Sequence, residues 1–81
     1  MRPAPEFEAL LQEIQTLLET AGLDVAERHP ARLARISRHV AEAEEPLAAA
    51  RRGDAGATTR LLALLRFARD EAAQLASEPR P

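Results

Sequence analysis

Large apolar residues recur along this chain at steps of three and four, and this spacing constrains the fold more than any other feature. The pattern runs through three stretches, at about residues 5–21, 30–52 and 55–77. Such steps keep side chains on one side of an α-helix, whereas a half-buried strand would need strict alternation. The sequence therefore predicts an all-α fold, a small antiparallel three-helix bundle. Prolines near both ends predict disordered tails at 1–5 and 78–81 around one helical domain at 6–77.

The first helix has the clearest pattern and a marked end. Its apolar side contains Phe7, Leu10, Leu11, Ile14, Leu17, Leu18 and Ala21. Gly22 follows in the position where a left-handed residue often closes a helix, with Leu23 placed to fold back onto the last turn. Residues 24–27 (Asp-Val-Ala-Glu) have the residue types of a capping box, and His29-Pro30 then interrupts the pattern. We expect one short helical turn at 24–29.

The second stretch keeps its phase across a proline. Its apolar positions are Leu33, Ile36, Val40, Ala43, Leu47 and Ala50. Pro46 lacks a backbone donor and collides with the carbonyl of Glu42, which costs about 3 kcal/mol in a straight helix. A stripe that continues in phase across it predicts one helix with a kink at Pro46. Gly53 and Gly56 mark the next turn, after which either Asp54 or Thr58 can cap the third helix.

Core volume is scarce in this chain. Eighteen of its apolar residues are alanine and only nineteen are larger. Alanine favours the helix but buries little area, and below about 70–80 residues a lone core seldom supplies more than ~3–5 kcal/mol. The sequence has no cysteine, so no disulfide can compensate. We therefore expect oligomerisation to complete the bundle, with a homodimer as the simplest form.

The third helix carries more apolar surface than a peripheral bundle helix needs. Counting about 100° per residue, Phe67 and Leu62 point roughly 120° to either side of Leu61, and Leu64 lies beside Phe67. Large apolar side chains outside the core stripe are typical of an interface. We predict Leu62, Leu64 and Phe67 as anchors for a partner or a second subunit. The alternative is that residues 47–50 of the kinked helix cover this side.

A basic row on the second helix is the second candidate site. It consists of Arg28, Arg32, Arg35, Arg38 and His39. Spaced at helical steps, it could contact phosphates along a nucleic-acid groove. The net charge of −2 and the absence of Tyr and Trp argue against nucleic acid. We expect the row to pair with carboxylates of the first helix or of another chain, with a nucleic-acid-binding regulator as the alternative.

The sequence offers no recognisable catalytic, cofactor-binding or metal-binding constellation. His39 and Glu42 are one turn apart, but no second pair could join them at a metal ion. The glycines all fall at turns, so no phosphate loop or nucleophile elbow is present. We expect a chain that is not an enzyme and has no cofactor. The absence of a long apolar run predicts a cytoplasmic protein without a membrane partner, and arginine without lysine is typical of a GC-rich bacterial genome.

These observations favour a non-enzymatic helical module that self-associates and presents a helix face to a protein partner. The nucleic-acid-binding regulator is the main alternative. A weaker alternative is an antitoxin or immunity-type protein, in which the acidic first helix would cover a basic toxin surface.

Overall fold

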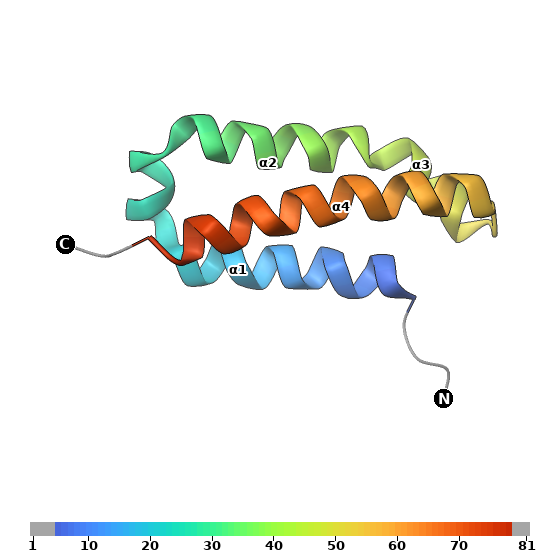
Figure 1. Cartoon of the computed structure of the whole chain (residues 1–81), viewed down its shortest axis with the longest axis horizontal. Coiled ribbons are helices and arrows are strands. Elements are labelled where there is room, and N and C mark those ends of the chain that lie inside the picture. The colour runs from blue at the N-terminus through green and yellow to red at the C-terminus, as the bar shows by residue number, and fades with distance from the viewer. Residues whose placement is uncertain (1–4, 79–81) are drawn as a thin grey trace.

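The computed structural model describes residues 5–78, and within that range the chain forms helices and no strand. The helices are α1 (Glu6–Arg28), α2 (Pro30–Glu42), α3 (Glu44–Arg51) and α4 (Ala55–Ala76). Because α3 continues the course of α2 beyond a bend, these segments pack as three helices (Figure 1). The predicted all-α three-helix bundle is confirmed. Of the predicted tails, residues 1–4 and 79–81 lie outside the described residues.

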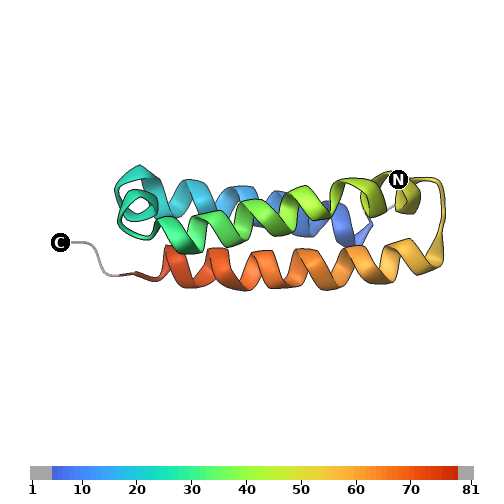
Figure 2. The same ribbon diagram turned by 90° about the horizontal axis from the view of Figure 1, so that it is seen from above.

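The three helices are arranged in two layers. α1 and α4 point in the same direction, and α2–α3 runs antiparallel to both (Figure 1). α4 packs along α1 and along α2–α3, whereas α1 and α2 contact each other sparsely. Seen from above, α1 and α2 lie on the same side of α4 (Figure 2). The shortest extent of the Cα atoms is 14 Å, which fits two layers of helices with axes about 8–10 Å apart.

The hydrophobic core lies along α4. Its buried residues on that helix are Leu61, Leu65, Ala68, Ala72 and Leu75, spaced three and four apart. α1 contributes a similar line of buried residues: Phe7, Leu10, Ile14, Ala21 and Val25. α2 contributes only Ile36. The helix that is last in the chain is therefore the one on which the other helices assemble.

α1 is broken at Gly22, whose φ of 81° and ψ of 166° are not helical. The positive φ confirms that the chain turns here through a conformation that favours glycine. The predicted closing contact is wrong, because the Leu23 side chain is 73% exposed and does not fold back onto the preceding turn. The helix resumes at Leu23, so Asp24 lies inside a first turn and does not precede it. The predicted capping-box register is therefore also wrong, although a carboxylate is favourable in a first turn.

The second helix bends at Ala43, three residues before Pro46. Pro46 thereby falls in the first turn of α3, where a missing N–H leaves no helical hydrogen bond unmade. The Ala43 N–H donates to both the His39 and Val40 carbonyls, at 3.0 and 3.2 Å, which tightens the chain at the bend. The predicted proline kink is confirmed. Its centre lies about one turn earlier because the proline ring clashes with the carbonyl four residues before it.

The turn before α4 shows which of the two predicted residues, Asp54 or Thr58, caps this helix. The Asp54 carboxylate accepts a hydrogen bond from the Ala57 N–H at 2.9 Å, which makes Asp54 the N-cap. The Thr58 hydroxyl donates to the Asp54 carbonyl at 2.9 Å and so supports the same turn.

Candidate functional site

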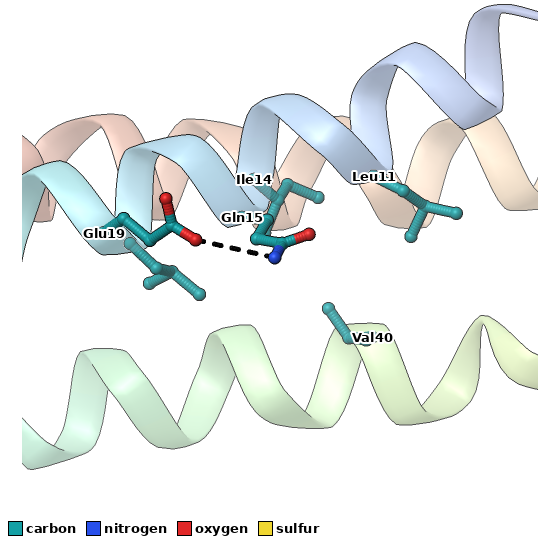
Figure 3. Close-up of a pocket in the computed structure, with 6 residues that line it drawn as sticks. Leu11, Ile14, Gln15, Glu19 and Val40 are labelled. Carbon is teal, nitrogen blue, oxygen red and sulfur yellow. Dashed lines mark hydrogen bonds between the residues drawn. The ribbon is translucent and has the colours of Figure 1, made fainter.

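A shallow groove runs between α1 and α2, on the side of the bundle away from α4 (Figure 3). Its volume is about 420 Å³, and its lining residues are Leu11, Ile14, Gln15, Leu18, Glu19 and Val40. The groove exists because α1 and α2 both pack on α4 and only sparsely on each other. Within the described residues, no helix lies over it.

Aliphatic side chains follow a seven-residue repeat on both of the helices that form this groove. Leu11 and Leu18 are seven apart on α1, and Leu33, Val40 and Leu47 are seven apart on α2–α3. Each of the five is partly buried, so part of every side chain remains accessible. A seven-residue spacing keeps such side chains in line along one side of a helix and is typical of the seam along which a further helix packs. The groove therefore has the pattern of a helix-packing surface.

The two rims of the groove differ in chemistry. On the α1 rim, the Gln15 amide donates to a Glu19 carboxylate oxygen at 3.5 Å, and both side chains are exposed (Figure 3). On the α2 rim, the exposed residues near Leu33 and Val40 include three with short side chains: Ala34, Ser37 and Ala41. Short side chains let another backbone approach α2 closely. The α1 rim is thus polar and acidic, whereas the α2 rim has short side chains at these three positions.

An ion pair links α1 to α3 beside the Leu11 end of the groove. The Arg51 guanidinium contacts one Glu8 carboxylate oxygen through Nη2 at 2.7 Å and through Nε at 2.8 Å. Because Arg51 is engaged in this way, its charge is offset by Glu8. This ion pair connects α1 to α3, just beyond the end of α2.

The predicted interface residues of α4 lie in different surroundings. Leu62 and Leu64 are partly buried and pack against the core, so much of their surface is used within the chain. Phe67 is 62% exposed. Its ring stacks on the His39 imidazole of α2, with 5.9 Å between the ring centroids. The most accessible apolar surface of this predicted patch is therefore one aromatic ring.

Two arginines of the predicted basic row are engaged with acids near the C-terminal end of α4. Arg32 Nη1 lies 2.8 Å from Glu78 Oε1, and Arg35 Nη1 lies 3.3 Å from Glu71 Oε1. His29 Nε2 is 3.8 Å from the other oxygen of Glu78. The expected pairing of the row with the first helix is wrong for these two arginines, because α2 places them beside α4. Glu78, which the proline pattern assigns to the C-terminal tail, is engaged in these contacts with α2.

The remaining members of the row differ from these two. Arg28 and Arg38 are exposed and form no ion pair within residues 5–78. His39 is partly buried, and its Nδ1 atom has no hydrogen-bond partner in the described part of the chain. The row therefore does not present five free cationic groups on one surface.

Metal and membrane chemistry have no counterpart in residues 5–78. Within that range, no three side chains of the metal-ligating types come close enough to share an ion. No helix there combines the length and the apolar character that crossing a bilayer requires.

No protein-family model, curated protein or solved structure shows significant similarity to this chain. Its function is therefore inferred from its own geometry, in which the groove between α1 and α2 is an accessible hollow lined mainly by aliphatic side chains.

Sequence reasoning did not identify this groove. The stripe on the first helix assigns Leu11 and Leu18 to the core, and both do pack against it. The available signal was the seven-residue spacing within the wider stripes of the first and second helices. Periodicity alone does not show that the same residues leave surface open between two helices, because that depends on how far apart α1 and α2 lie.

Proposed function

We propose that this chain is a non-enzymatic helical interaction module whose α1–α2 groove accepts an amphipathic helix from a protein partner. The bound helix would complete a four-helix arrangement. The observation that carries the proposal is the double row of partly exposed aliphatic residues at seven-residue spacing, with Leu11 and Leu18 facing the row that contains Val40.

The apolar surface supports binding of moderate strength. Completing the burial of the five aliphatic residues of the seven-residue repeats contributes about 2–3 kcal/mol in total, since each is already partly covered. Four aliphatic side chains from a partner helix add roughly 6–8 kcal/mol. Association and ordering of the helix oppose this by at least about 4 kcal/mol. The balance corresponds to a Kd in the sub-millimolar range, about 0.1 mM.

A synthetic helix tests the proposal directly. The probe is a labelled 21-residue peptide of three heptads with leucine at the a and d positions and uncharged residues elsewhere, titrated with the full chain and followed by fluorescence anisotropy. We expect saturable binding to the wild type. Gln15→Arg should remove it, because Gln15 lines the groove and is exposed, so the bulk is added without disturbing the core.

Gln12→Arg is the matched control for Gln15→Arg. Gln12 is exposed on the same helix and does not line the groove, so the same substitution there should change the Kd less than twofold. Absence of saturable binding to the wild type, or equal loss in both variants, would contradict the groove as the binding surface.

We also propose that the chain self-associates, and the exposed side chain of Phe67 supports this part of the proposal. Phe67 and Leu23 are the exposed large apolar side chains of residues 5–78, and Phe67 is the one that lies on α4. Neither Phe67 nor His39 lines the α1–α2 groove, so we expect a homodimer formed at Phe67 to leave the groove free.

A further inference from the structure

The charges around the groove are distributed unevenly. α1 carries six carboxylates and a single arginine, Arg28. Two of these acids are paired with arginines of other helices: Glu8 with Arg51, and Glu6 with Arg66 at 3.1 Å. The other four form no ion pair within residues 5–78: Glu13, Glu19, Asp24 and Glu27. α1 therefore keeps an uncompensated negative charge after the bundle has folded.

Glu19 brings part of that charge to the groove itself. It is a lining residue, and its contact within the groove is with the neutral Gln15 amide, so its charge is not neutralised there. Glu44 is exposed one turn beyond Val40, on the same side of the bent helix, and has no ion pair in the described part of the chain. No arginine belongs to the groove lining.

We propose that the groove selects a cationic amphipathic helix, one with a seven-residue apolar stripe and arginine or lysine along the edge that lies over α1. This inference rests on the function proposed above and specifies the chemistry of the partner. Complementary charge favours a basic edge beside Glu19. The opposite edge lies over the short, uncharged side chains of Ala34, Ser37 and Ala41, which leave room for close backbone approach, and Glu44 follows them at the start of α3.

Two further peptides separate this inference from groove binding as such. Both keep the leucine stripe of the uncharged probe. One has arginine at the positions that flank the stripe and the other has glutamate. At low salt the arginine peptide should bind the full chain at least tenfold more tightly than the glutamate peptide. The difference should shrink as salt rises, because at about 0.1 M salt charges are screened over ~10 Å.

A pair of charge reversals distinguishes the groove from the overall charge of the protein. Glu19→Arg and Glu13→Arg change the net charge equally, and both residues are exposed on α1. Glu13 lies about 120° around the helix from Glu19 and does not line the groove. We expect Glu19→Arg to weaken the arginine peptide about five- to tenfold, since exposed ion pairs are individually weak, and Glu13→Arg to weaken it less than twofold. Thermal unfolding of both variants checks that the bundle stays folded.

The outcomes are distinct. If the uncharged peptide binds but the arginine peptide binds no better than the glutamate peptide, the cationic partner is wrong and the groove function stands. If both reversals weaken the arginine peptide equally, the peptide follows net charge and the inference is again wrong. If none of the three peptides binds the wild type, the proposed function fails together with the inference. If the wild type instead forms a dimer that Gln15→Arg dissociates, a second copy occupies the groove and the cationic partner is overturned.

Discussion

Gly22→Ala perturbs the break within α1, and the structure allows its effect on stability to be worked out. With φ at 81° and ψ at 166°, residue 22 lies in a backbone region that is nearly exclusive to glycine and costs other residues about 1–3 kcal/mol. A Cβ added there meets no heavy atom within 4 Å, so the backbone alone causes the cost. Alanine also restricts the unfolded chain, which offsets about 0.4–1 kcal/mol. The expected net loss in the free energy of unfolding is about 1–2 kcal/mol.

Gly56→Ala is the matched control, with the opposite expected sign. Gly56 lies in the first turn of α4, and an added Cβ would be 3.5 Å from an Asp54 carboxylate oxygen, which is ordinary contact. In a helix, alanine is more stable than glycine by about 0.5–1 kcal/mol. Urea unfolding followed by circular dichroism measures both changes. In a domain of this size, each 1 kcal/mol corresponds to a shift in Tm of about 4–8 °C.

Equal changes in the free energy of unfolding for Gly22→Ala and Gly56→Ala would contradict the proposed backbone cost at residue 22. A Gly22→Ala variant as stable as the wild type would mean that residue 22 is not held at positive φ. The break in α1 would then need another cause.

The other predictions concern single contacts. Phe67→Ala should lower the stability of the monomer by only about 1–2 kcal/mol, because 62% of the residue is already exposed and full burial would correspond to ~3–5 kcal/mol. Sedimentation should show a larger effect on any dimer, and a monomeric wild type at high micromolar concentration would remove Phe67 as a subunit contact. Asp54→Ala should cost about 1 kcal/mol in urea unfolding through loss of the α4 N-cap, and an unchanged midpoint would contradict that cap. Substituting both Arg32 and Arg35 by Glu should destabilise the bundle by about 1 kcal/mol, since the new carboxylates would repel Glu78 and Glu71. The wild type should show no salt-sensitive binding to duplex DNA, and such binding would favour the nucleic-acid-binding regulator instead.

Helix positions and breaks could be predicted from the sequence because they depend on local properties. The apolar steps predict all three helices, Gly22 supplies the positive φ at the first break, and Pro46 bends the second helix. Each of these follows from a side chain and its neighbours within one or two turns. The exceptions are the contact of Leu23 and the capping-box register at Asp24, because both depend on the ψ of Gly22, which residue type does not determine.

The candidate site could not be predicted because it depends on the distance between helices. Arg32 and Arg35 pair with acids of α4 and not of α1, since α2 packs against α4. The same preference for α4 separates α1 from α2 and leaves Leu11 and Val40 on the walls of a groove. A single amphipathic stripe shows which side of a helix is apolar, but not how many neighbours share it.

The most direct test of the groove is a methyl NMR titration of the full chain with the uncharged three-heptad peptide. The account predicts that the methyl signals of Leu11, Ile14, Leu18 and Val40 shift together and saturate with a single Kd, because these residues line the groove. The signals of Leu61 and Leu75, which are fully buried against the other helices, should move little. Shifts centred on Leu62 and Leu64, or no saturable shift at millimolar peptide, would contradict the α1–α2 groove as the binding surface.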